Sequence, residues 1–202
     1  MSERQRRIWK SGVGGSRSRS GGVTSLAEPV HEGAGTAFVT LAGQRKEVAK
    51  ARWNWNTELG LAVRVVRGRK MRVLAGVFNE FAAALQFPTY FGENKAAFDE
   101  CIREADEFSR DAGLVVLLTE PDQILADEPV ESLSWLIWTL EAAAVEWGMP
   151  IALGEWWDRP ALPFHVVLAG DDPTIADSTS RWEAAGLSRP GTVDATGEIS
   201  SL

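Results

Sequence analysis

Residues 87–102 read FPTYFGENKAAFDECI, and this stretch decides how the rest of the chain is interpreted. Pro88 disfavours helical geometry in the residue before it, so a preceding helix should end there. Gly92 permits a tight turn, and Asn94 is a favourable N-cap because its side chain can accept a hydrogen bond from a free backbone N–H. The stretch therefore predicts an apolar loop that delivers the chain into a helix over residues 95–108.

The predicted helix has two unlike faces. At about 100° per residue, its apolar side chains share one face: Phe98, Cys101, Ile102, Ala105 and Phe108. Three glutamates line up on the opposite face: Glu100, Glu104 and Glu107. Like charges at this spacing destabilise a helix by roughly 0.2–0.5 kcal/mol per pair, whereas Asp99 stands one turn before Arg103 and can pair with it. One flank is thus neutralised, and the other is an acidic stripe that fits either a plain solvated surface or a site for a basic partner.

Hydrophobic patterns on either side of this stretch predict alternating strands and helices. Strands are expected at residues 38–41, 62–66, 114–118 and 164–169, helices at 72–86 and 130–147, and a short helical turn at 121–126. Residues 44–59 are ambiguous, because their first part reads as helical and Trp53-Asn54-Trp55-Asn56 fits alternation or a turn. Strands separated by helices imply a parallel sheet with right-handed crossovers, and hence an α/β fold.

Composition divides the chain into four parts. Residues 1–35 are rich in Gly, Ser and Arg and are expected to form a disordered basic leader. Residues 36–61 make an N-terminal extension, 62–170 the main domain, and 171–202 a polar, peripheral C-terminal tail.

Charge and cysteine content limit the classes of function. The net charge is −7, and residues 95–148 carry three bases against thirteen acids. Such a block repels nucleic acid and attracts basic proteins, although a solvated face would look the same. Cys101 is the only cysteine, so no intrachain disulfide is possible. With no recognisable secretory signal and no apolar stretch of membrane-spanning length, a cytoplasmic protein is expected.

The loop and the helix resemble those of the barstar family, whose members inhibit the ribonuclease barnase. Tyr90-Phe91-Gly92-Glu93-Asn94 matches the family's aromatic-aromatic-Gly-Glu-Asn segment, and Cys101 matches a cysteine of the same helix. Residues 63–88 follow the family's first strand and helix without a gap, and the resemblance covers about residues 63–170. It implies a barstar-like three-layer α/β domain, in which helices pack a small, three-stranded parallel β-sheet, and a protein that plugs a ribonuclease active site.

The resemblance also implies which residues meet the ribonuclease. These are Tyr90, Gly92, Asn94, Glu100 and Glu141, and Asp99 or Glu104 is expected to occupy the phosphate site together with Glu100. The loop residues shape and fill the contact, and Glu100 takes the place of the family's dominant helix aspartate. Glu141 is the nearest candidate for a glutamate that the family uses on its last long helix.

Three positions depart from the family pattern. The first helix aspartate is replaced by Ala96, an aromatic contact residue by Asp99, and a leucine by Lys95. A related ribonuclease with a shifted basic pocket is therefore a more plausible target than barnase itself.

These implications describe an inhibitor that forms a 1:1 complex with a secreted basic microbial ribonuclease. It would be an immunity protein of a toxin–antitoxin pair, monomeric when free. No cofactor, metal, catalytic residue, nucleic acid or membrane is expected to take part.

An enzyme is one alternative reading. His31 and His165 are the only histidines, the first in the leader and the second at the start of a strand, where a structural role is the better interpretation. Cys101 falls on the core face of its helix, which is typical of an inert thiol.

Two binding functions are further alternatives. Arg64, Arg67, Arg69, Lys70 and Arg72 lie near Trp53 and Trp55 and could bind RNA, or could simply balance the acidic half of the protein. A barstar fold that has lost ribonuclease inhibition is motivated by Ala96. In that case Trp156-Trp157, in an insertion at residues 149–163, would be the docking patch.

Overall fold

A sheet of seven strands forms the centre of the described protein, in the order β1-β7-β6-β2-β5-β4-β3. The computed structural model describes residues 24–31, 37–104, 113–156 and 158–200. The strands are β1 (Thr24–Ser25), β2 (Phe38–Ala42), β3 (Ala62–Arg67), β4 (Leu114–Thr119), β5 (Phe164–Gly170), β6 (Gly191–Val193) and β7 (Glu198–Ser200). From β6 to β3 each strand is parallel to its neighbour, and β7 runs antiparallel to both β6 and β1. The predicted α/β class is confirmed.

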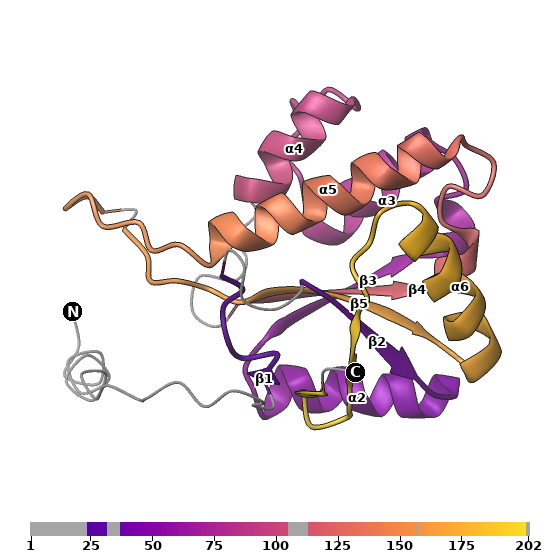
Figure 1. Cartoon of the computed structure of the whole chain (residues 1–202). Coiled ribbons are helices and arrows are strands. Elements are labelled where there is room, and N and C mark those ends of the chain that lie inside the picture. Colours follow the sequence, from indigo (N-terminus) through magenta and orange to yellow (C-terminus); the bar gives the residue numbers. More distant parts are fainter. Residues whose placement is uncertain (1–23, 32–36, 105–112, 157, 201–202) are drawn as a thin grey trace.

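Helices cover both faces of the sheet and make three layers (Figure 1). The helices are α2 (Arg45–Thr57), α3 (Leu74–Leu85), α4 (Lys95–Glu104), α5 (Val130–Trp147) and α6 (Asp172–Ala184), with short 3-10 turns η1 (Gly68–Lys70) and η3 (Pro121–Gln123). Buried side chains of α3, α4, α5 and α6 form one hydrophobic core, and those of α2 belong to a second core on the other face. Because β4 and β5 lie between the two cores, they are apolar on both faces, as the continuous run at residues 114–118 predicted.

The N-terminal extension is part of the sheet and its cover. β2 pairs with β5 on one side and β6 on the other, so the sheet is larger than the three strands that the resemblance implied. The ambiguous residues 44–59 contain a single helix, α2, which begins with a capping box between Gln44 and Glu47. Its Ala51 and Trp55 are buried against the sheet.

The expectation of a peripheral C-terminal tail is wrong. Trp182 of α6 is fully buried, with its ring centroid 5.7 Å from that of Phe38 in β2. β6 extends the parallel sheet beyond β2, and β7 joins it to β1. The segment looks polar overall because only one narrow stripe of α6 is buried, represented by Ile175, Ser178 and Trp182.

The predicted leader is also partly built into the fold. Residues 1–23 and 32–36 lie outside the described part of the chain. Between them, β1 pairs with β7, and Leu26 and Val30 are buried. In the described ranges, no helix has both the length and the apolar character needed to cross a bilayer.

Candidate functional site

The loop before α4 is held by an aromatic cluster and presents one aromatic side chain to solvent. The rings of Phe87 and Phe91 pack edge-on at 5.1 Å between centroids, and Phe91 also contacts Phe78 of α3 at 6.1 Å. Tyr90, between them, is 77% exposed. Aromatic packing on either side thus fixes the backbone that displays the tyrosine.

Asn94 both shapes this loop and starts α4, as the sequence predicted. Its Oδ1 accepts a hydrogen bond from the backbone N–H of Ala97 at 3.0 Å, and its Nδ2 donates to the carbonyl of Gly92 at 3.1 Å. A Cβ on Gly92 would lie 2.9 Å from that Nδ2, so glycine is favoured by the close approach of the amide. The residue with left-handed backbone geometry is Glu93, at φ 48°, rather than the glycine.

The inner face of α4 is anchored in the main core. The fully buried ring of Phe98 packs against Phe81 at 5.1 Å and Trp135 of α5 at 5.4 Å. Cys101 is buried too, and burial raises the pKa of its thiol, with smaller contributions from Glu100 and Glu104. A buried thiol with a raised pKa is a poor nucleophile, as expected from its place on the helix.

An ion-pair cluster joins the flank of α4 to α5. Arg103 pairs with Asp99 at 2.9 Å, as the i, i+4 spacing predicted. Its guanidinium also pairs with Glu146 in the last turn of α5. The sequence did not identify Glu146, because nothing local to residue 146 indicates which helix lies beside it. The carboxylate of Asp99 is therefore already engaged within the protein.

Glu100 and Glu104 form the exposed acidic stripe of α4. Both side chains face solvent, and neither forms an ion pair with any described residue. Ala96, one turn before Glu100, is exposed on the same outer surface. Glu107, the third predicted member of the stripe, lies outside the described residues. The two described glutamates are thus an uncompensated pair of charges on a rigid helix.

Glu141 does not join this stripe. Trp135 and Glu146 of α5 both contact α4, through Phe98 and Arg103. Glu141 follows Trp135 by six residues, which turns it by about 240° around the helix axis and away from α4. It is half-buried, and this burial raises the pKa of its carboxyl. The sequence pointed to Glu141, but the acid of α5 that lies beside α4 is Glu146.

A cation at the start of α4 is also held internally. The Nζ of Lys95 lies 4.9 Å from the centroid of the Trp135 ring, within the range of a cation–π contact. Trp135 was not singled out from the sequence, where it looks like any other residue of an amphipathic helix. This contact keeps a positive charge on the α5 side of α4, away from Glu100.

The basic strip considered for RNA binding is largely neutralised by acids within the fold. Arg67 donates two side-chain hydrogen bonds to Glu80 and holds the pKa of that carboxyl below its usual range. Arg69 pairs with Glu120 at 2.6 Å. Arg72 pairs in the same way with Asp127. Guanidinium groups that already face carboxylates are poorly placed to neutralise phosphates, so the charge-balancing interpretation is favoured.

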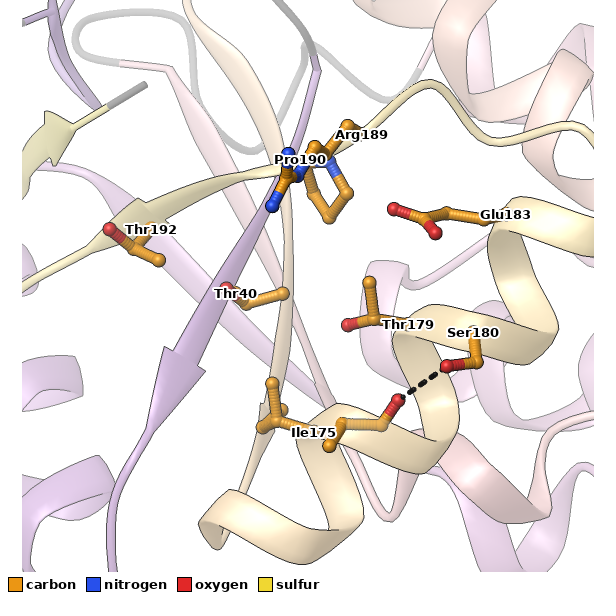
Figure 2. A pocket seen from close by; sticks show the side chains of 9 residues that line it. Thr40, Ile175, Thr179, Ser180, Glu183, Arg189, Pro190 and Thr192 are labelled. Carbon is orange, nitrogen blue, oxygen red and sulfur yellow. Dashed lines mark hydrogen bonds between the residues drawn. The ribbon is translucent and has the colours of Figure 1, made fainter. Parts of the chain in front are cut away.

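A shallow hollow of about 470 Å³ lies between α6 and strands β2 and β6 (Figure 2). It is lined by Thr40, Ile175, Ala176, Thr179, Ser180, Glu183, Arg189, Pro190 and Thr192. The Ser180 hydroxyl donates to the carbonyl of Ala176 at 3.1 Å, the dashed line in Figure 2, and the Thr40 hydroxyl donates to that of Gly191. Neither histidine nor cysteine lines the hollow, and Glu183 is its one carboxylate.

The catalytic candidate His165 lies in a structural position. His165 is buried in β5, and its Nε2 lies 3.0 Å from the carbonyl oxygen of Glu28. Within the described ranges, no cluster of three or more His, Cys, Asp or Glu side chains could hold a metal ion.

Comparison with known proteins gives one family and several distant folds. The model of the family described as barstar (barnase inhibitor) matches residues 61–169. No curated protein matches the chain. Among solved structures, a chain in the structure of Drosophila ORC bound to AT-rich DNA and Cdc6 is 13% identical with a TM-score of 0.41, and covers 79% of this chain and 48% of its own. The crystal structure of Cdc6p from Pyrobaculum aerophilum is 16% identical with a TM-score of 0.43, and covers 81% and 44%. The chain thus spans about half the length of these proteins, and likeness at such TM-scores carries no argument about function.

Proposed function

The chain belongs to the barstar family of barnase inhibitors, and we propose that it inhibits a barnase-like ribonuclease by covering the enzyme's basic active site. The family consists of inhibitors and binds its enzyme as a protein partner. In the proposed complex, α4 and the loop before it form the contact surface. Tyr90 packs on the enzyme, Gly92 and Asn94 hold the loop in shape, and Glu100 and Glu104 occupy the phosphate-binding site. Inhibition is steric and electrostatic and requires neither a cofactor nor catalysis.

One observation carries this proposal: Glu100 and Glu104 are exposed on one face of α4 without a counter-ion among the described residues. Elsewhere in the fold, acids such as Glu80 and Asp127 are matched with arginines. A rigid helix pre-organises the two unmatched charges, which lowers the entropic cost of binding. The arginines and lysines that hold an RNA phosphate would supply the missing counter-ions and speed up association.

The target we infer is a relative of barnase rather than barnase itself. Ala96 replaces the family's first aspartate in the first turn of α4. The carboxylate of Asp99 is paired with Arg103. The charge offered to the enzyme is therefore shifted towards Glu100 and Glu104, along the helix. A basic pocket displaced in the same direction would match it best.

The biological setting follows from this activity. We propose that the protein is a cytoplasmic immunity protein, which protects its producer by forming a 1:1 complex with a secreted basic ribonuclease. Glu141 is on another face of α5, so we expect it to contribute less than Glu104.

The test is an inhibition titration against barnase and other secreted guanyl-type ribonucleases of bacteria and fungi. We expect stoichiometric inhibition of at least one enzyme, with an affinity that falls as salt is added. Glu100→Gln should weaken binding by about 2–5 kcal/mol, a range to which measurements on barnase and its inhibitor contribute. Glu58→Gln removes an exposed charge at the C-cap of α2, on the opposite face of the sheet, and should leave affinity nearly unchanged.

Two results would reject this proposal. One is the absence of inhibition of every enzyme tested. The other is inhibition that is insensitive both to salt and to Glu100→Gln. Either result would favour the alternative of a barstar fold that binds a different partner, to which the exposed Ala96 already points.

A further inference from the structure

A hairpin-like arm projects from the end of α5 before the chain enters β5 (orange in Figure 1). Its described part is residues 149–156 and 158–159, and Trp157 lies outside the described residues. The arm is closed at its base by Ile151 and Arg159, which exchange two backbone hydrogen bonds of 2.9 and 3.0 Å. In Figure 1 the arm extends beyond the layers formed by the sheet and its helices.

Arg159 fixes the base of the arm to α5. The residue is only 9% exposed, and its Nη1 donates to the backbone carbonyls of Trp147 and Met149 at 3.1 and 2.9 Å. Its Nη2 donates to the carbonyl of Glu146 at 3.4 Å. Carbonyls in the last turn of a helix lack partners within the helix and favour a nearby cation. The arm is therefore held by a buried charge at the helix terminus and has a defined direction.

Asp158 gives the tip of the arm its shape. Its carboxylate accepts hydrogen bonds from the backbone N–H groups of Leu153 and Gly154 at 2.9 and 2.8 Å. These bonds hold the pKa of Asp158 below its usual range, and the bond from Leu153 makes the largest contribution. Gly154 has a φ of 84°, which favours glycine at the turn. Both ends of the arm are thus ordered by polar contacts.

This ordered tip presents apolar side chains to water. Trp156 is 79% exposed and Leu153 is 73% exposed, and Met149 at the base is also exposed. The acids Glu155 and Asp158 flank them. The basic residue of the arm, Arg159, is buried. An apolar tip with acidic flanks suits a partner that has an apolar hollow within a basic surface, and it is repelled by anionic membranes.

The arm and the acidic helix are joined through a single residue. The backbone carbonyl of Glu146 accepts from Arg159 of the arm, and the side chain of Glu146 pairs with Arg103 of α4. The arm therefore begins where the charged surface between α4 and α5 ends. A partner bound over the end of α4 that carries Arg103 and Glu104 approaches the end of α5 from which the arm begins.

We propose that residues 149–156 and 158–159 are a second contact arm for the ribonuclease held by α4, with Trp156 seated in an apolar hollow beside the enzyme's basic site. This inference rests on the proposed inhibition and adds a determinant of target choice. α4 would recognise the phosphate-binding site, which related ribonucleases share, and Trp156 would recognise the surface around it, where they differ. Tryptophan supplies a large apolar contact for few rotatable bonds, and it is enriched among the residues that dominate interfaces.

The test compares Trp156→Ala with Trp53→Ala, a matched control. Trp53 is 62% exposed on α2, on the other face of the sheet. Dissociation constants are measured against whichever enzyme the unaltered protein inhibits, drawn from barnase and other secreted guanyl-type ribonucleases. We expect Trp156→Ala to weaken binding roughly ten- to hundredfold, mainly through faster dissociation. Trp156→Phe should recover part of the loss, and Trp53→Ala should have no effect. Urea unfolding of Trp156→Ala should match that of the unaltered protein, because the side chain lies outside the core.

The possible results test the proposed arm and the proposed inhibition separately. Inhibition that is unchanged by Trp156→Ala overturns the arm and leaves the proposed function in place. Absence of inhibition by the unaltered protein overturns both. A change of sedimentation from dimer to monomer in Trp156→Ala, without any change in inhibition, would assign the arm to contact with a second copy and overturn the proposal.

Discussion

His165 shows how one buried side chain couples the stability of the protein to pH. Its imidazole lies in β5, with Nε2 at 3.0 Å from the carbonyl oxygen of Glu28 and with Nδ1 unpartnered among the described residues. Burial favours the neutral ring and lowers the pKa of His165 from 6.5 to about 4, against a smaller opposing effect of the Glu28 carbonyl. A neutral ring that donates from Nε2 satisfies the contact with Glu28 and ties the N-terminal segment to the sheet.

The depressed pKa predicts a loss of stability in mild acid. Between about pH 4 and 6.5 the unfolded chain binds more protons than the folded one, so the free energy of unfolding falls as the pH drops through this window. The full effect is on the order of 3 kcal/mol. His165→Gln keeps an N–H donor but does not titrate, so it should lose this part of the pH dependence. Urea unfolding of both proteins at about pH 7 and about pH 4.5 measures the difference. Parallel pH profiles would contradict the prediction.

Single residues were predictable where their role is local. Asn94 caps α4 through an N–H three residues away, and Arg103 reaches Asp99 across one helical turn. Both contacts follow from helix geometry alone. Glu146, which reaches the same arginine, is 43 residues away along the chain, and only the packing of α5 beside α4 brings it there.

At the scale of elements, the sequence of α5 predicts its structure clearly, whereas the sequence of α2 is ambiguous. The predicted bounds of α5 match the structure, because Pro129 and Gly148 mark its ends and its apolar residues recur at helical spacing. In α2, the short pattern around Trp53 and Trp55 fits two readings. Residues two apart share one face of a strand, whereas on a helix they lie about 200° apart and point in nearly opposite directions. The burial of Trp55 and the exposure of Trp53 therefore fit the helix and not a strand.

Gly148 provides a prediction at this scale. It follows the last residue of α5 at φ −68° and ψ −8°, a conformation open to any residue, so the helix end alone does not require glycine. A Cβ there would, however, lie 1.9 Å from the carbonyl oxygen of Val30. Gly148→Ala should therefore push the N-terminal segment away and destabilise the protein by about 1–3 kcal/mol.

Denaturant unfolding gives the magnitude, and hydrogen exchange locates the change. The amide of Leu26 donates to the carbonyl of Gly197, so its protection should fall in the Gly148→Ala variant. Unchanged stability together with unchanged protection of Leu26 would show that the segment is not pressed against the end of α5.

At the scale of the whole molecule, the C-terminal segment is part of the core. Trp182→Ala removes a fully buried indole that packs on Phe38 and donates to the carbonyl of Pro121 at 3.2 Å. We expect a loss of about 3–5 kcal/mol in the free energy of unfolding. Trp53→Ala, at an exposed position, should change it by no more than about 0.5 kcal/mol. Equal effects of the two substitutions in urea unfolding would restore the view of a peripheral tail.

Charge is also organised at this scale. Arginines near the ends of β3 and η1 are matched with acids of α3 and of the segment around η3, and Arg103 is matched with acids of α4 and α5. Glu100 and Glu104, on the outer face of α4, are among the exposed carboxylates that no described base pairs with. The net charge of the sequence does not show which charges are paired, because it counts paired and unpaired charges alike.

Features that depend on near neighbours along the chain could be predicted from the order of amino acids. These are the α/β alternation, the span of α5, the cap at Asn94, the two faces of α4 and the loop segment that carries the family resemblance. Periodicity, capping and turn chemistry act over a few residues, so they can be read directly from the order of amino acids.

What distant segments do to one another follows from the three-dimensional packing of the chain. This packing places β6 beside β2, buries Trp182 on Phe38, joins Glu146 to Arg103 and ties Arg159 of the arm to the same end of α5. Each of these contacts depends on the packing of whole elements around a shared core. That packing is set by the sum of many weak apolar contacts and leaves no local mark at any one residue.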